Sequence, residues 1–366
     1  MIPVTKPALP DLEKYVGYLQ RIWRTRWLTN NGEFALRLEQ SLKGYLKVKN
    51  IILVTNGTLA LQLALRSLGL RGEVITTPFT FIATTNSILW EGLTPVFADI
   101  DPETFNINPE DVERKITEKT CAILAVHVYG NPCVVEALAD IAEKHGIKLI
   151  YDGAHGFAVE YKGRSVFDYG DVSTLSFHAT KIFNTIEGGA LTTKDAKLAG
   201  ELRLLRDHGI RSAEEFMVVG TNAKMNEFQA AMGLCNLDDV ERNMMLREAL
   251  YKRYVEKLGK VGQFQFQKLV ASRYNYSYMP VCFENSSQRD LIYEELLRQG
   301  VGSRKYFYPL TVDAHYFSSK GTDFEKKFGL TVASDVAGRV LCLPLYPDLG
   351  FEAVDRIVEI IRNNAC

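Results

Sequence analysis

The sequence predicts an α/β fold with a mostly parallel sheet, followed by a smaller α+β domain. The chain has 366 residues, which is too many for one ordinary core, so we expect a large and a small domain. Short β-rich runs alternate with helical stretches between about residues 50 and 195, as in parallel strands joined by crossover helices. Hydrophobic residues make up 46% and charged residues 24%, which is typical of a globular protein.

Seven apolar runs are the candidate strands of the large domain. Each is short and nearly continuous, as expected for strands that helices cover on both faces. The runs are Ile51–Thr55, Val74–Thr77, Pro95–Asp99, Cys121–Val126, Ile147–Asp152, Val172–Phe177 and Ala190–Thr193. They predict a seven-stranded sheet.

Helical stretches fill the intervals between these runs. Leu59–Leu68, Thr84–Trp90 and Val134–His145 have helical composition and length. Asn108–Asp111 predicts a helix start, because an Asn cap is followed by proline in the first turn and then by acids near the positive end of the dipole. A longer helical pattern extends from Met225 to about Leu258.

The C-terminal part predicts a smaller domain. Tyr274–Phe283 alternates like a half-buried strand, Gln288–Gln299 forms an amphipathic helix, and Phe351–Ile361 forms another. We place the boundary inside the long helical pattern, with residues 1–245 as the large domain and 246–366 as the small one.

Charge and cysteine content narrow the class of protein. The 43 basic and 44 acidic residues nearly balance, so neither nucleic acid nor an anionic membrane is expected as a partner. No apolar run is long enough to span a bilayer, and Met1–Tyr15 lacks the apolar core of a signal peptide. The six cysteines form no CxxC pair, which favours reduced thiols in the cytoplasm.

The segment Ser176–Lys181, followed by Glu187–Gly189, holds the central candidate residue. Lys181 lies in a loop just past a predicted buried strand, where α/β folds place ligands. Desolvation and nearby cations would lower its pKa and free the amine to attack a carbonyl group. The alternative is a solvated surface lysine.

Asp152 and His155 follow another predicted strand. A carboxylate at such a position can keep a ring nitrogen of a cofactor protonated, which makes the ring an electron sink. His155 could hydrogen-bond the same cofactor or stack on it. The alternative for Asp152 is a helix N-cap, a role that contributes about 1 kcal/mol.

Thr55–Thr58 links a strand to a helix with small residues, so that backbone N–H groups and a hydroxyl can enclose a phosphate. Many strand–helix turns look similar and bind nothing. The signatures GxGxxG, GxxxxGK[ST], HExxH and GxSxG are absent. No ligand spacing supports a metal site built from His155, His178 and Asp152, and no metal is expected.

Nine short motifs extend in order from residue 27 to residue 347. They are Trp27–Gly32, Leu38–Glu39, Asn56–Thr58, Thr80–Thr84, His127–Gly130, Asp152–His155, Ser176–Lys181 with Glu187–Gly189, Asn226–Ala231 and Leu343–Pro347. Their order and spacing resemble the DegT/StrS family of sugar aminotransferases, which have the aspartate-aminotransferase fold of pyridoxal-5′-phosphate (PLP) enzymes, fold type I.

The resemblance implies PLP as cofactor and gives roles to three residues. Lys181 would form the imine link to PLP and carry the proton between substrate and cofactor. Asp152 would pair with the pyridinium nitrogen, and His155 would lie on the side of the phenolic oxygen.

Further cofactor contacts follow from the same resemblance. Gly57, Thr58 and Ser176 would bind the phosphate, and Phe81 would stack on the ring face away from the lysine. Asn222 would reach the phosphate of the partner subunit, which implies a homodimer with shared active sites. The alternative is that Asn222 caps the helix that begins near Met225.

Two stretches depart from the family pattern. A GYNYRM-like motif is here Gly220–Met225, with Thr221, Ala223 and Lys224 in place of two tyrosines and an arginine. Arginine and lysine are not equivalent at a site that needs a planar fork. The family's PLH is here Pro309–Thr311, without the histidine.

The implied reaction moves an amino group from L-glutamate to a nucleotide-linked ketosugar. The stretch Phe177–Asn184 favours dTDP-4-keto-6-deoxyglucose as acceptor, giving dTDP-4-amino-4,6-dideoxyglucose, with O-antigen or other lipopolysaccharide synthesis as the setting. The alternatives are a 3-ketosugar aminotransferase and a PLP-binding regulator without turnover. A sugar dehydratase is disfavoured because that branch replaces the lysine with histidine, and an oxidoreductase would need a glycine fingerprint.

Overall fold

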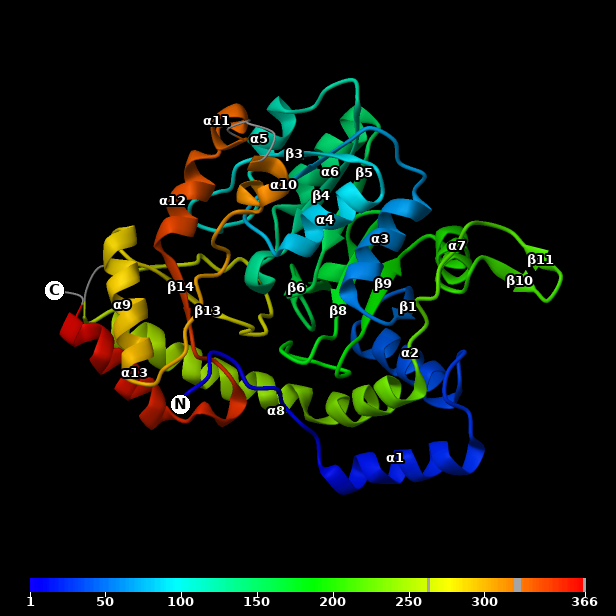
Figure 1. The fold of residues 1–366 in the computed structure, drawn as a ribbon, viewed down its shortest axis with the longest axis horizontal. Helices are drawn as coiled ribbons and strands as arrows, with labels where there is room; N and C mark the ends of the chain where they lie inside the picture. Colours follow the sequence, from blue (N-terminus) through cyan, green and yellow to red (C-terminus); the bar gives the residue numbers. More distant parts are fainter. Residues whose placement is uncertain (262–263, 319–323, 365–366) are drawn as a thin grey trace.

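The computed structural model describes residues 1–261, 264–318 and 324–364. Its main feature is a seven-stranded sheet in the order β1-β9-β8-β5-β4-β2-β3 (Figure 1). The strands are β1 (Asn50–Val54), β2 (Glu73–Thr76), β3 (Thr94–Phe97), β4 (Thr120–Val126), β5 (Lys148–Asp152), β8 (Val172–Ser176) and β9 (Gly189–Thr193). Within this sheet β9 runs antiparallel to both neighbours and the other strands are parallel, so the predicted mostly parallel seven-stranded sheet is confirmed.

Side chains on successive strand residues point to opposite faces, and both faces are buried. In β1, Ile51 and Leu53 enter one hydrophobic cluster while Ile52 and Val54 enter another. One face packs against α3 (Gly57–Ser67), α4 (Ile82–Trp90) and α7 (Ala196–Arg206). The other packs against α2 (Glu33–Tyr45), α5 (Pro109–Arg114), α6 (Val135–His145) and α8 (Glu227–Leu258).

Helix starts follow the expected capping chemistry. The Asn108 side chain accepts from the N–H of Glu110, and Pro109 occupies the first turn of α5, as predicted. The long helix α8 begins two residues later than expected, because Asn226 and Gln229 form a capping box there. Asn226 is therefore the N-cap, and the alternative that Asn222 caps this helix is wrong.

α8 runs for 32 residues beneath both parts of the molecule (Figure 1). Its first half contributes Ala230 and Leu234 to the core under the large sheet, and its second half contributes Tyr254 and Leu258 to a separate core. The expected domain boundary at residue 245 falls inside this continuous helix. That division stays a prediction.

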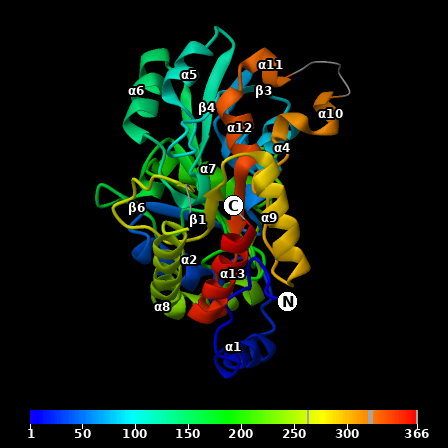
Figure 2. The same ribbon diagram turned by 90° about the vertical axis from the view of Figure 1, so that its left-hand side faces the viewer.

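The second core surrounds a three-stranded antiparallel sheet, β12-β13-β14. Its elements are β12 (Gln265–Phe266), β13 (Met279–Cys282), β14 (Val340–Leu343), α9 (Ser286–Arg298) and α13 (Phe351–Asn364). α13 lies alongside the C-terminal part of α8 in both views (Figures 1 and 2). This α+β arrangement matches the prediction.

The strand expected over Tyr274–Phe283 is wrong in length, because only Met279–Cys282 pairs in the sheet. Upstream of it, the Asn275 side chain donates to the main-chain oxygens of His155 and Phe157, each at 2.8 Å. The alternating pattern there therefore reflects contacts with the loop after β5 and not strand pairing.

The first residues of the chain also belong to the second unit. Ile2 forms a parallel bridge with Val301, and its carbonyl accepts from the N–H of Gly302.

The remaining α-helices and strands are α1 (Leu12–Thr25), β6 (Glu160–Tyr161), β7 (Arg164–Ser165), β10 (Ile210–Ser212), β11 (Glu215–Phe216), α10 (His315–Ser318), α11 (Phe324–Phe328) and α12 (Thr331–Arg339). Across the described ranges, no helix has both the length and the apolar character needed to cross a bilayer.

Candidate active site

A cavity of about 550 Å³ opens where β1, β5 and β8 end, at the carboxyl edge of the parallel strands. This is the edge at which open α/β sheets bind ligands. Seven of the eight residues predicted for the site line it, and Asn222 does not. The seven are Gly57, Thr58, Phe81, Asp152, His155, Ser176 and Lys181.

Asp152 is the last residue of β5 and is buried. Its Oδ1 accepts from the N–H of Ala154 at 3.0 Å, and its Oδ2 accepts from the Thr84 hydroxyl at 2.7 Å. Burial raises the pKa of Asp152, while these hydrogen bonds and the charge of Lys181 act in the opposite direction. No helix follows Asp152 in this loop, so the helix-cap alternative is wrong.

Lys181 lies in the loop between β8 and β9 and is partly buried. Burial lowers the pKa of Lys181 to about 8; the negative charge of Asp152 opposes this shift and the positive charge of Arg304 adds to it. The uncharged amine, which can act as a nucleophile or base, is therefore much more populated near neutral pH than in an ordinary lysine. This environment contradicts the alternative of a solvated surface lysine.

His155 is buried with both ring nitrogens engaged. Its Nδ1 accepts from the N–H of Tyr129 at 3.2 Å, which places the ring proton on Nε2. Nε2 lies 3.3 Å from the Tyr278 hydroxyl and donates to it. Burial, with the charges of Lys181 and Arg304, holds the pKa of His155 well below its ordinary value. His155 is therefore neutral, with one donor in a fixed position.

The end of the cavity next to β1 is a helix N-terminus. α3 begins at Gly57, is capped by the Asn56 side chain, and carries no acid in its first turn. A Cβ placed on Gly57 would lie 2.9 Å from the Cβ of Ser176, so glycine is needed for this close approach. Free N–H groups, the helix dipole and the hydroxyls of Thr58 and Ser176 together suit an anion such as phosphate.

Phe81 stands just before α4 at the mouth of the cavity, with 47% of its surface exposed. A large aromatic side chain this exposed beside polar lining groups is suited to covering a flat ligand ring.

Asn222 is also exposed but outside the cavity. It lies near the phosphate end, because the carbonyl of the next residue, Ala223, accepts from the N–H of Thr55.

Arg304 and Tyr306 also line the cavity, and no sequence motif predicted either of them. They come from the segment between α9 and α10, more than 120 residues after Lys181 in the sequence. The Arg304 guanidinium lies over the Tyr306 ring, 4.1 Å from its centroid. No local motif marks these residues, since only the packing of the small unit on the large one brings them to the cavity.

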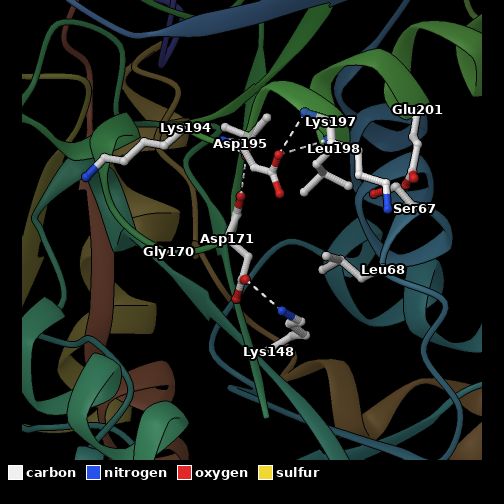
Figure 3. A pocket seen from close by; sticks show the side chains of 11 residues that line it. Ser67, Leu68, Lys148, Gly170, Asp171, Lys194, Asp195, Lys197, Leu198 and Glu201 are labelled. Atoms are coloured by element: carbon white, nitrogen blue, oxygen red, sulfur yellow. Dashed lines mark hydrogen bonds and ion pairs between the residues drawn. The ribbon is translucent and has the colours of Figure 1, made fainter. Parts of the chain in front are cut away.

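A second hollow lies at the opposite edge of the sheet, where β5 and β8 begin (Figure 3). Several of its charged groups are already paired with protein groups. Lys148 forms a 3.0 Å ion pair with Asp171, and Asp195 caps the first turn of α7 (Figure 3). Among the described residues, no group of three or more His, Cys, Asp or Glu side chains is placed to hold a metal ion. The candidate site is therefore the cavity at the carboxyl edge, which contains the reactive Lys181.

Comparison with known proteins decides which family uses this arrangement. The sequence profile of the DegT/DnrJ/EryC1/StrS aminotransferase family matches residues 11–362. The chain belongs to this family. The family resemblance seen in the motifs is thereby confirmed, and the chain is an aminotransferase.

Individual relatives of this DegT/DnrJ/EryC1/StrS aminotransferase cover nearly all of it. It is 41% identical to the dTDP-4-amino-4,6-dideoxy-D-glucose transaminase of Escherichia coli over 98% of both chains. It is 34% identical to the GDP-perosamine synthase of Caulobacter vibrioides, over 98% of this chain and 97% of the relative.

Solved structures agree with the fold. The structure of DesI with its TDP-sugar product has a TM-score of 0.92 and 34% identity, covering 100% of this chain and 93% of that one. Helicobacter pylori PseC, an aminotransferase of pseudoaminic acid biosynthesis, has a TM-score of 0.89 and 27% identity, covering 99% and 98%. The predicted fold of PLP-dependent aminotransferases is confirmed.

Lys224 and Thr311, which depart from the family pattern, both have structural roles outside the cavity. Lys224 is buried and forms an ion pair with Asp207, at the end of α7, so it serves the fold around the Asn222 loop. Thr311 is buried and accepts a 3.0 Å hydrogen bond from the Thr85 hydroxyl. Neither side chain lines the cavity.

Proposed function

We propose that this aminotransferase binds PLP in the cavity and moves an amino group from L-glutamate to dTDP-4-keto-6-deoxyglucose, giving dTDP-4-amino-4,6-dideoxyglucose. The observation that carries the proposal is the joint placement of Lys181, Asp152 and the α3 N-terminus around one cavity. The family is PLP-dependent, and PLP requires three groups: an amine for its aldehyde, an acid for its ring nitrogen and an anion site for its phosphate.

The residues present fit that cofactor. Gly57, Thr58 and Ser176 would hold the phosphate, because glycine lets the N-terminus of α3 lie close to Ser176, where a Cβ at Gly57 would come within 2.9 Å of the Ser176 Cβ. Asp152 lines the same cavity as a buried carboxylate. Phe81 would cover one face of the ring. When bound, PLP supplies an electron sink that stabilises negative charge at the substrate carbon.

The chain's own residues have distinct tasks in this proposal. Lys181 holds the cofactor and then, as a free amine of lowered pKa, takes and returns the proton at the reacting carbon. Asp152 keeps its charge toward the ring nitrogen, supported by the hydrogen bond from Thr84. His155 stays neutral and directs its Nε2 proton toward the Tyr278 hydroxyl or an oxygen of the ligand.

The choice of acceptor rests on the relatives. The E. coli relative at 41% identity is named for the dTDP-linked 4-amino-4,6-dideoxyglucose, and the DesI structure contains a TDP-sugar product. The first supports a dTDP-linked 4-ketosugar over the 3-keto alternative, and the second supports a TDP-linked sugar as substrate. The chain is an enzyme, so the alternative of a regulator without turnover is not supported. A role in O-antigen or other lipopolysaccharide synthesis, in the cytoplasm, remains part of the proposal.

The active site is proposed to be shared between two subunits of a homodimer. Asn222 is exposed beside the phosphate end but does not line its own cavity, and it does not cap α8. A side chain so placed is free to reach the phosphate site of a symmetry-related copy. An isologous dimer would use two such contacts, one for each site.

The test is a substrate screen of the purified protein with L-glutamate as donor. The acceptors are dTDP-4-keto-6-deoxyglucose, its 3-keto isomer and a GDP-linked 4-keto-6-deoxy sugar, with products identified by NMR and mass spectrometry. We expect turnover with the first acceptor and a yellow protein in which borohydride fixes the cofactor to the peptide containing Lys181. Lys181→Ala should lose turnover by more than about 100-fold. Preference for the 3-keto isomer, or labelling of another lysine, would overturn the proposal.

A further inference from the structure

Tyr306 lines the cavity, and the proposed chemistry gives it no task. The residue is only 7% exposed, so bulk water contributes little to the hydrogen bonds of its hydroxyl. Thr180, which directly precedes Lys181, lines together with Tyr306 both this cavity and a small adjoining one of about 50 Å³. Tyr306 therefore lies on the side of the cavity that carries the lysine loop.

The Tyr306 side chain is held by both units of the molecule. The Tyr129 hydroxyl, in the large unit, donates a hydrogen bond to the Tyr306 carbonyl. The Arg304 guanidinium lies over the Tyr306 ring, 4.1 Å from its centroid. The Arg304 backbone exchanges hydrogen bonds of 3.0 and 2.8 Å with Cys342 of β14. The ring and its hydroxyl therefore have a defined position.

A chain of hydrogen bonds ends at the Tyr306 hydroxyl. The Tyr129 N–H donates to Nδ1 of His155 at 3.2 Å, so Nε2 carries the ring proton and donates to the Tyr278 hydroxyl at 3.3 Å. The Tyr278 and Tyr306 rings pack with centroids 5.4 Å apart, and their hydroxyls are hydrogen-bonded to each other. Since the Tyr278 oxygen accepts from His155, its own proton is available for Tyr306. The bond acts to raise the pKa of Tyr278 and to lower that of Tyr306, as expected if Tyr278 is the donor.

This arrangement leaves the Tyr306 proton for a ligand. The Tyr306 oxygen accepts from Tyr278, so its proton is directed elsewhere, and in the part of the chain that the structure describes it is paired with no protein acceptor. Burial raises the pKa of Tyr306, although the charge of Arg304 and the bond from Tyr278 oppose the shift. The hydroxyl therefore stays protonated near neutral pH and offers the cavity a neutral hydrogen-bond donor.

We propose that the Tyr306 hydroxyl binds the keto oxygen of the sugar acceptor and thereby places the carbonyl carbon beside Lys181. This inference rests on the proposed function. A keto oxygen only accepts hydrogen bonds, which matches a hydroxyl whose own oxygen is already occupied. Lys181 acts at the reacting carbon, and the keto oxygen is bonded to that carbon. A donor for this oxygen must therefore stand on the lysine side of the cavity, where Tyr306 lies.

The other oxygens of the sugar nucleotide match Tyr306 less well. Phosphates bind best to cations or to several N–H groups together, such as those at the N-terminus of α3. A sugar hydroxyl could accept the same bond as a ketone, because its oxygen also has lone pairs. The informative comparison is therefore between the ketosugar and a ligand that has no oxygen at C4.

The experiment measures equilibrium binding to the yellow holoenzyme without an amino donor, so that the ketosugar binds but is not converted. The ligands are dTDP-4-keto-6-deoxyglucose and dTDP-4,6-dideoxyglucose, which lacks the C4 oxygen, and the method is calorimetry. We expect Tyr306→Phe to weaken binding of the ketosugar about fivefold, on the scale of one neutral hydrogen bond. Binding of the 4-deoxy ligand should change by less than about twofold.

Infrared difference spectroscopy gives a readout that a structural role would not move. A ketosugar labelled with ¹³C at C4 identifies its carbonyl stretching band among the protein bands. In the wild type this band should lie at lower frequency than in Tyr306→Phe, because a donated hydrogen bond weakens the C=O bond. The phenylalanine ring keeps the contact with Arg304, so the variant removes only the hydroxyl.

Tyr308→Phe is the matched control. Tyr308 is 52% exposed, lies under the Arg289 guanidinium and does not line the cavity. This variant should equal the wild type in both measurements. Equal weakening of both ligands by Tyr306→Phe, or a carbonyl band that the variant leaves unchanged, would overturn the inference while leaving the proposed function intact. A wild type that neither binds nor converts the ketosugar would refute the proposed function, and the inference with it.

Discussion

The Thr84 hydroxyl donates a 2.7 Å hydrogen bond to Oδ2 of Asp152, although the two residues are 68 positions apart in the sequence. Thr84 in turn accepts from the Thr80 hydroxyl at 2.8 Å, because its own proton is used on Asp152. Burial raises the pKa of Asp152. The two linked hydrogen bonds oppose this shift, because they stabilise the ionised carboxylate. In the proposed function Thr84 is thus a positioning residue for Asp152.

Replacing Thr84 with valine should therefore weaken the support of the Asp152 carboxylate without removing a contact to the substrate. We expect Thr84→Val to lower turnover roughly 10-fold, which corresponds to about 1.4 kcal/mol in the barrier. The acid side of the pH–rate profile should move to higher pH, because the pKa of Asp152 loses a stabilising hydrogen bond. Thr84→Ser keeps the hydroxyl and should restore both values. A serine variant no better than valine would mean that Thr84 acts only by packing.

The titration of Lys181 gives a prediction for the protein freed of cofactor. Labelling of Lys181 by an amine-reactive reagent, followed by mass spectrometry, should rise with pH through a half-point near 8, since only the uncharged amine reacts. Asp152→Asn removes a negative charge that raises the pKa of Lys181, so the half-point should fall. Arg304→Gln removes a positive charge that lowers it, so the half-point should rise.

The exposed Lys194 serves as an internal control in the same digest, because its side chain is 50% accessible and it lines the second hollow, at the opposite edge of the sheet. Its labelling should not respond to either substitution. A Lys181 half-point near 10.5, the ordinary lysine value, would contradict the buried environment.

The close approach at Gly57 predicts a specific loss of cofactor affinity. Gly57→Ala puts a Cβ 2.9 Å from the Cβ of Ser176, so α3 and the end of β8 must separate. We expect the apparent dissociation constant for PLP to rise about tenfold or more, equivalent to at least about 1.4 kcal/mol. Absorbance titration of the cofactor-free protein measures it. Gly200→Ala in α7, where a Cβ meets nothing within 4 Å, is the matched control and should bind PLP normally.

The shared site can be tested by mixing two inactive variants, Lys181→Ala and Asn222→Ala. In a mixed dimer both lesions can fall in the same site, which leaves the other site intact. If subunits exchange freely, activity should return to about one quarter of the wild-type value in an equal mixture. The test requires that Asn222→Ala alone be severely impaired and that exchange be verified by mass. With both controls met, a mixture that regains nothing would exclude a shared site.

Much of the site could be predicted because its groups lie in local motifs at strand ends. The runs ending near Val54, Asp152 and Ser176 have the apolar pattern of buried strands, and each is followed by the polar residues that line the cavity. Parallel strands bring their carboxyl ends to one edge, so the pattern alone places Gly57, Asp152 and Lys181 together. The family motifs added the role of each residue.

Arg304, Tyr306 and the Thr84–Asp152 bond were decided only by the tertiary structure. Residues 304–306 follow an ordinary helix, and nothing in their neighbours indicates a ligand; they reach Lys181 because the small unit packs against the large one. The error at Tyr274–Phe283 has the same origin, since an alternating pattern reports which side chains are buried but not what buries them. Periodicity along the chain fixes local conformation and burial, whereas contacts between distant segments depend on how the finished elements pack.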